Sequence, residues 1–193
     1  MKALFILLLG IFLTAYFLLV GTAVRAYPTG PDPAHTGGFG ENTCRQLGCH
    51  VTFELNEGRA LGLGDVVISP PKEYEPGKTY PITVTVTHTQ DRGHWGFQLA
   101  ARVKATGVQA GELKPIDDTT QILIEKGIQY IEHTRDGIDF NIFKFNWVAP
   151  SSQVGEVIMH AAGNAADGDL TPEGDYIYST SASVPPTTTG SPK

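Results

Sequence analysis

The sequence predicts a mainly β protein, in which an antiparallel β-sandwich follows an irregular segment and an N-terminal hydrophobic helix. Three observations lead to this expectation. Apolar and polar residues alternate from about Asp65 to Val184, glycine and proline are concentrated between Tyr27 and Gly64, and an unbroken apolar run lies near the N-terminus. No later window has convincing helical periodicity, and strict alternation is typical of half-buried strands.

Residues 1–26 are predicted to form a signal peptide or an N-terminal membrane anchor. Lys2 precedes an apolar run from Ala3 to Val20, and small residues suited to signal peptidase follow. The run is about 18 residues long, which approaches the length of a membrane span, so anchoring through residues 3–24 stays open beside cleavage. Both alternatives predict an extracytoplasmic location, in the periplasm or at the cell surface, with attachment to the inner membrane if the helix is retained.

Residues 27–64 are predicted to form an irregular haem-attachment segment, for reasons given below. They are rich in Gly, Pro, Thr and Asn and have few consecutive apolar residues. Such a segment cannot build a core of its own, so its order depends on a cofactor, on the following domain, or on both. A short helix is expected around His50–Glu57. At the other end of the chain, residues 185–193 are of low complexity and are predicted to be disordered.

Residues 65–184 are predicted to form the sandwich itself. In residues 81–89 the apolar Ile82, Val84 and Val86 alternate with threonines. The same alternation occurs in four further stretches, which are His94–Val103, Phe143–Trp147, Val157–Ala161 and Tyr176–Val184. Turn-forming residues separate them, and about seven short strands without a long helical insert are typical of an antiparallel sandwich.

The strongest chemical motif is the sequence from Cys44 to His50. Cys44 and Cys49 are the only two cysteines, and His50 directly follows the second. Covalent haem attachment needs two thiols for the porphyrin vinyl groups and an imidazole for the iron, and usually places two residues between the cysteines. Here four residues separate them. We expect one covalent haem c, with Cys44 and Cys49 as thioether donors and His50 as the proximal iron ligand.

The motif has two alternative interpretations. A small Cys44–Cys49 disulfide loop is compatible with an exported protein, although so short a loop stabilises little. A zinc site would need further cysteines, and the chain has none.

His133 is the preferred second ligand on the other face of the haem iron. It ends the strand-like stretch Tyr130–Thr134 beside a turn, a position from which a side chain reaches a docked cofactor. Two neutral imidazoles would close the iron coordination and suit electron transfer. Met159, His88 and an open site stay as alternatives, whereas His35, His94 and His160 are weaker candidates.

The composition argues against several functions. The formal net charge of −6 disfavours nucleic acid and anionic lipid headgroups as partners. The chain has no nucleophile–base–acid constellation and no glycine-rich phosphate loop, so we do not expect an enzyme. The acidic stretch 167–175 lacks the ligand register of a calcium-binding EF-hand loop and is predicted to be a solvated loop.

Several further sequences carry a resemblance to a known family; they are Thr36–Cys44, Tyr74–Tyr80, Trp95–Leu99, Tyr130–Thr134, Phe145–Pro150 and Ala161–Asp169. Through them the chain resembles the Reeler domain family, and in particular bacterial exported members that carry a haem motif ahead of the sandwich. The resemblance implies an immunoglobulin-like Reeler sandwich. It also supports His133, because the Tyr-Ile-x-His-Thr string recurs in the haem-bearing members.

The sequence therefore predicts an exported monohaem c-type cytochrome that carries single electrons. Its expected partners are redox proteins, in particular a membrane-bound electron-transfer complex. The alternative is a non-haem Reeler-like module for binding or surface attachment, with a Cys44–Cys49 disulfide. Since a fold does not dictate chemistry, the resemblance alone does not decide between the two.

Overall fold

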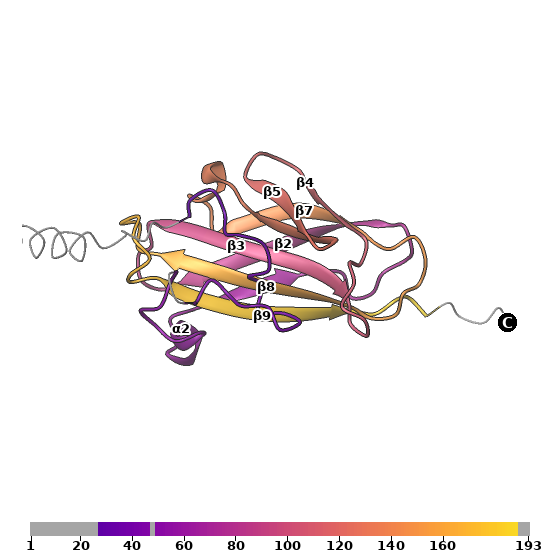
Figure 1. The fold of residues 1–193 in the computed structure, drawn as a ribbon, viewed down its shortest axis with the longest axis horizontal. Helices are drawn as coiled ribbons and strands as arrows, with labels where there is room; N and C mark the ends of the chain where they lie inside the picture. The colour runs from indigo at the N-terminus through magenta and orange to yellow at the C-terminus, as the bar shows by residue number, and fades with distance from the viewer. Residues whose placement is uncertain (1–26, 47–48, 189–193) are drawn as a thin grey trace, which may run out of the picture.

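The computed structural model describes residues 27–46 and 49–188 (Figure 1). Its nine strands form two antiparallel sheets that pack face to face, which confirms the predicted mainly β sandwich. The predicted signal peptide or anchor at residues 1–26 lies outside the described residues. Within the described part of the chain, no helix is long and apolar enough to cross a membrane.

The first sheet has four strands in the order β1-β2-β7-β4. They are β1 (Gly64–Ser69), β2 (Thr79–His88), β7 (Ile142–Val148) and β4 (Glu112–Pro115). The alternation predicted for β2 is confirmed, because Ile82, Val84 and Val86 are buried and face the second sheet.

The second sheet has five strands in the order β5-β6-β3-β8-β9. They are β5 (Thr120–Glu125), β6 (Ile128–His133), β3 (His94–Val103), β8 (Val157–Ala166) and β9 (Tyr176–Val184). The core lies between the two sheets, where Phe97 of β3 stacks on Phe143 of β7 with ring centroids 4.3 Å apart. Buried aromatic pairs of this kind dominate the energetics of such a core.

Helical structure is limited to two short elements in the described residues. They are α2 (Glu57–Ala60) and the 3-10 turn η1 (Arg135–Gly137). The helix predicted around His50–Glu57 is therefore wrong in position, since α2 begins where that prediction ended. Asn56 adopts a left-handed conformation just before α2, and the helix cannot extend backwards through it.

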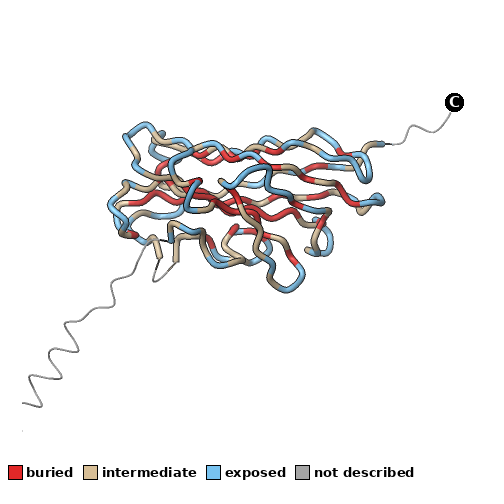
Figure 2. Tube along the Cα trace, turned by 90° about the horizontal axis from the view of Figure 1, so that it is seen from above, coloured by how far each residue is buried: buried red, intermediate tan, exposed pale blue. Residues whose placement is uncertain are grey.

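Residues 27–46 cover the outer face of the five-stranded sheet, where they cross β3 and β8 (Figure 1). Strand β3 is consequently buried on both faces rather than on one. Figure 2 shows the runs of buried residues along the strands in red. The side chain of Gln98, which points away from the core, is fully buried. It accepts a hydrogen bond from the backbone of His35 (2.7 Å) and donates one to the carbonyl of Asp32 (3.0 Å).

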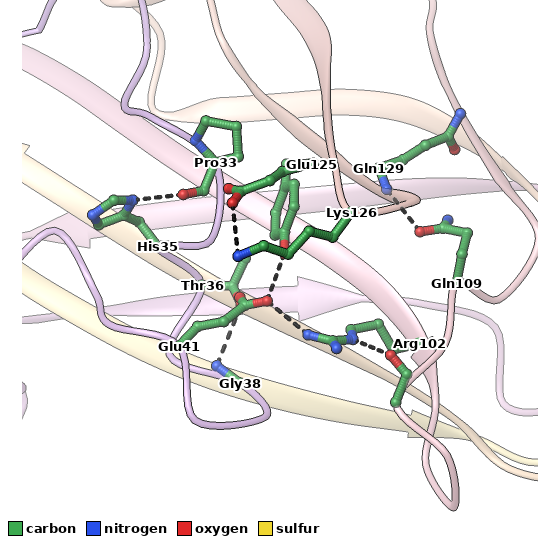
Figure 3. Close-up of polar contacts among 12 residues, drawn as sticks. Pro33, His35, Thr36, Gly38, Glu41, Arg102, Gln109, Glu125, Lys126 and Gln129 are labelled. Atoms are coloured by element: carbon green, nitrogen blue, oxygen red, sulfur yellow. Dashed lines mark hydrogen bonds and ion pairs between the residues drawn. The ribbon is translucent and has the colours of Figure 1, made fainter.

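Glu41 provides a second attachment of this segment to the sheet (Figure 3). Its Oε1 lies 2.6 Å from the Arg102 guanidinium and accepts a hydrogen bond from the Tyr130 hydroxyl, also at 2.6 Å. Its Oε2 accepts a hydrogen bond from Thr36 at 2.5 Å. The segment is too polar to form a core, as expected, but buried polar contacts of its own hold it on the sandwich.

The predicted disorder of residues 185–193 is wrong for the first three residues. Tyr74 donates its backbone N–H to the carbonyl of Pro185, and Thr187 donates to the carbonyl of Tyr74. The paired residues 185–187 follow β9 directly in the chain. Low sequence complexity did not reveal it because backbone groups, rather than side chains, make the contacts.

Candidate functional site

A pocket lies between the outer face of the five-stranded sheet and the covering N-terminal segment. The sheet side is formed by residues of β3, β6 and β8, which include His94, Gly96, Phe97, His133 and Asn164. The segment contributes Tyr27, Pro28, Pro31, Asp32, His35, Cys44, Gln46, Cys49 and His50. All four sequence-predicted site residues, Cys44, Cys49, His50 and His133, therefore line one pocket.

The pocket is partly enclosed, and its cavity volume is about 110 Å³. Sites for organic ligands of moderate size occupy roughly 300–1,000 Å³. A porphyrin is larger than this cavity, so its binding would require the N-terminal segment to move away from the sheet.

His50 is held at the pocket by an acidic neighbour. Its Nδ1 lies 2.8 Å from Oδ2 of Asp175, and the two side chains are 11% and 1% exposed. The ring is not aligned for a hydrogen bond to that oxygen, so alignment requires a rotation of the imidazole. The amide nitrogen of Asn164 lies 3.5 Å from Nε2 of His50, which is too long for a strong hydrogen bond.

His133 stands at the end of β6 and is only 7% exposed. Its Nδ1 lies 3.1 Å from the backbone N–H of Phe97 and 3.2 Å from the carbonyl of the same residue. The backbone of Phe97 can therefore pair with either neutral tautomer of His133. With Nδ1–H donated to the carbonyl, Nε2 keeps the free lone pair that iron ligation requires.

Burial lowers the pKa of His133 below its usual value. Hydrogen bonds with the backbone of Phe97 and Tyr27 oppose this shift, and the nearby His50 adds to it. His133 is consequently neutral at physiological pH, the form in which histidine binds metals. The effect of His50 on the pKa of His133 also agrees with the place of both residues in one pocket.

Cys44 and Cys49 are free thiols in the structure. Burial raises the pKa of the Cys44 thiol to about 12, and Cys49 contributes in the same direction as the second cause. Since the thiolate is the reactive form, Cys44 is a weak nucleophile in this environment. Cys49 accepts a long contact of 3.7 Å from the side-chain amide of Gln46.

Two of the weaker ligand candidates also line the pocket. His35 is already engaged on both ring nitrogens, since Nδ1 lies 2.8 Å from the Asp32 carbonyl and Nε2 lies 2.6 Å from the Gln46 amide. His94 is partly buried and has its Nδ1 3.3 Å from a carboxylate oxygen of Asp139. His35 would have to give up a hydrogen bond to bind iron.

The alternatives to His133 named from the sequence lie elsewhere. Met159 is fully buried in the core between the sheets. His88 packs on the ring of Tyr176, with centroids 4.7 Å apart, and His160 packs against Phe39 at 5.4 Å. None of these three lines the pocket, so His133 is the best placed of the predicted second ligands.

The sequence analysis missed three residues at this pocket. Asp175 belongs to the acidic stretch predicted to be a solvated loop, but it is 2% exposed and turned toward His50. Gly96 and Asn164 are register partners on β3 and β8 and form part of the pocket floor. The alternation of β3 identified Gly96 as an outward position, yet nothing in the sequence indicated that the outer face was covered.

The donor set fits a haem group. Two thiols, a histidine next to the second thiol and a buried neutral histidine converge on one partly apolar pocket. The pocket also holds buried polar atoms without a hydrogen-bond partner, among them Nδ1 of His94 and Oδ1 of Asn164. No three His, Cys, Asp or Glu side chains form a metal-ion site in residues 27–46 and 49–188, but haem iron takes only two ligands from the protein.

Fold and pocket define the class of protein: a two-sheet antiparallel sandwich whose N-terminal segment closes a histidine- and cysteine-lined pocket. The family profile of the Reeler domain matches residues 66–163, about half of the chain. The chain therefore belongs to the Reeler domain family. The match covers the sandwich from β1 to β8 and does not include Cys44, Cys49 or His50.

Solved structures give the same result for the fold. The chain is similar to the crystal structure of the human F-spondin reeler domain, fragment 1, with a TM-score of 0.50 and 20% identity over 72% of this chain and 96% of that one. A crystal structure of the Reelin-N domain of F-spondin has a TM-score of 0.50 and 20% identity, over 71% of this chain and 94% of that one. At this identity the likeness concerns the fold alone. No curated protein matches the chain.

Proposed function

We propose that this Reeler-domain protein binds one haem c in the pocket beneath its N-terminal segment. The observation that carries the proposal is the convergence of Cys44, Cys49, His50 and His133 on one pocket. The first three residues come from the segment, whereas His133 comes from the sandwich. Convergence of these residue types from separate parts of the chain is the arrangement that covalent haem binding with two axial histidines requires.

Each residue has a distinct part in this proposal. Cys44 and Cys49 would hold the haem covalently through their sulfur atoms, and His50 and His133 would supply imidazole ligands to its iron. When bound, the haem supplies a one-electron couple. Because His50 lies in the N-terminal segment and His133 in the sandwich, ligation by both histidines would hold the segment on the domain.

We further propose that the protein acts as an exported one-electron carrier, as the bacterial Reeler members with a haem motif imply. Its partners would be redox proteins outside the cytoplasm, and retention of the N-terminal helix would keep it at the inner membrane. The net charge of −6 supports docking to a basic surface on such a partner rather than to nucleic acid.

The alternative is a non-haem Reeler module for binding or surface attachment with a Cys44–Cys49 disulfide. The comparisons favour this alternative over the electron carrier, because the matched family and structures are named as Reeler domains and none as a haem protein. One structural observation is compatible with it, since Cys49 is close enough to Cys44 to raise its pKa. The residue types that line the pocket, by contrast, favour haem.

A visible spectrum of the full-length protein, exported from cells that attach haem c, separates the two functions. We expect sharp α and Soret bands after reduction, and haem that stays on the polypeptide through acid–acetone extraction and denaturing electrophoresis. The double variant Cys44→Ser/Cys49→Ser should lose the covalent link, and His50→Ala should yield little mature holoprotein. A colourless wild-type protein with an intact Cys44–Cys49 disulfide by mass spectrometry would overturn the haem proposal and support the alternative.

A further inference from the structure

The carboxylate of Asp175 is buried beside the imidazole of His50. Its side chain is 1% exposed, and its Oδ2 lies 2.8 Å from Nδ1 of His50. A carboxylate this deep is costly unless it has partners, and so close a titratable neighbour is rarely incidental. No other charged side chain lies within ion-pair distance of His50 among the described residues.

The fold holds Asp175 in this place through its second oxygen and a neighbouring amide. Oδ1 accepts the backbone N–H of Asp167 at 3.0 Å, which closes the loop between β8 and β9. The amide nitrogen of Asn164 lies 3.3 Å from Oδ2, on the same side as His50. Asp175 directly precedes β9, so the sheet determines its position even though the loop carries it.

We propose that Asp175 is a positioning residue for His50: a rotation of the imidazole aligns Nδ1–H with the carboxylate, and this contact then directs Nε2 toward the pocket. The contact between Asp175 and His50 does not depend on the haem function proposed above. Its consequence for iron binding does rest on that function. A carboxylate that accepts the outer N–H of a ligating histidine fixes the tautomer and raises the basicity of the other nitrogen. Such partners commonly strengthen binding of the metal by roughly 10–100-fold.

The contact can be tested first in the protein without haem. A proton NMR spectrum of full-length protein made without haem attachment should contain a downfield, slowly exchanging Nδ1–H signal from His50. The signal should disappear in Asp175→Asn and persist in Asp167→Asn, which removes one charge from an exposed position of the same loop. Absence of the signal from the wild-type protein, or its persistence in Asp175→Asn, would overturn the proposal.

The consequence for haem is tested by adding haemin to the same three proteins. Asp175→Asn should bind haemin about 10-fold or more weakly than the wild type, whereas Asp167→Asn should bind it as the wild type does. In the reduced and oxidised holoproteins, Asp175→Asn should raise the midpoint potential by more than Asp167→Asn. Equal affinities and equal potentials in the two variants would overturn the positioning role.

The two experiments distinguish failure of the proposed haem binding from failure of the proposed Asp175–His50 contact. If the wild-type protein binds no haemin yet keeps an Nδ1–H signal that depends on Asp175, the haem function is wrong and the contact is right. If Asp175→Asn does not fold, the wild-type NMR signal alone decides, because its absence contradicts the contact.

Discussion

The imidazole of His133 lies directly against the bare backbone of Gly96. A Cβ placed on Gly96 would lie 2.8 Å from Cε1 of His133 and 3.1 Å from its Nδ1. Real Cβ atoms do not approach other atoms so closely. The absence of a side chain at this position of β3 is therefore what admits the histidine ring to the pocket floor.

Gly96→Ala should destabilise the protein by about 1–3 kcal/mol, because the added methyl group forces the His133 ring to move. Urea unfolding measures the change. The control is the same substitution in a His133→Ala background, where the ring is gone and the cost should largely vanish. Equal costs in both backgrounds would show that the methyl group clashes with something else.

His133→Ala should open one face of the haem iron in the holoprotein. We expect a high-spin spectrum or ready binding of carbon monoxide, whereas His133→Met should stay six-coordinate and have a higher potential, because a thioether favours reduced iron. His94→Ala is the matched control, since His94 lines the same pocket. A His133→Ala protein that stays low-spin and inert to carbon monoxide would shift the assignment to His35 or His94.

Glu41→Ala should loosen the N-terminal segment from the five-stranded sheet. The substitution leaves the Arg102 guanidinium, 18% exposed, without its carboxylate partner, which should cost about 3 kcal/mol. Hydrogen exchange should accelerate around residues 36–43 while the core strands stay protected. Glu156→Ala breaks the more exposed Lys104 pair and should cost below about 1 kcal/mol. Similar losses in the two variants would contradict the anchoring role of Glu41.

Glu132 should make the protein less stable as the pH rises. Burial raises its pKa to about 7, although hydrogen bonds from Gln98 and Gln121 act in the other direction. Since the carboxyl group has an ordinary pKa in the unfolded chain, the folded state binds its proton more tightly. Stability from this group is complete below about pH 4.5 and is lost as the pH approaches 7, by about 3 kcal/mol in total.

Urea unfolding of the wild type and Glu132→Gln at pH 5 and pH 8 measures this contribution. The stability difference between the two proteins should change by a few kcal/mol over the range, in favour of the wild type at pH 5. Glu156→Gln is the control and should produce little change between pH 5 and pH 8, because the Lys104 side chain lowers the pKa of Glu156 instead of raising it. A difference that does not depend on pH would show that Glu132 is already ionised at pH 5.

The sequence by itself determined the β-sandwich and the motif from Cys44 to His50. Alternation in β2 and β3 reflects one side of each strand that must be buried, a local property that needs no knowledge of the partner sheet. The junction of Cys49 and His50 is likewise readable, because covalent bonds fix their proximity. The strands β1, β4 and β5 escaped prediction. Glu112–Pro115 has only four residues, and Gly64–Ser69 and Thr120–Glu125 each hold three consecutive apolar residues instead of an alternation.

Only the tertiary structure decided where the site lies and which residues complete it. Burial of Gln98 on the outward side of β3 depends on residues 27–46, which are distant in sequence and carry no periodicity. The same holds for Asp175, whose stretch is indistinguishable from a solvated acidic turn until the fold turns it toward His50. Side-chain periodicity reports one buried face, whereas a pocket depends on long-range contacts between segments that have no pattern in common.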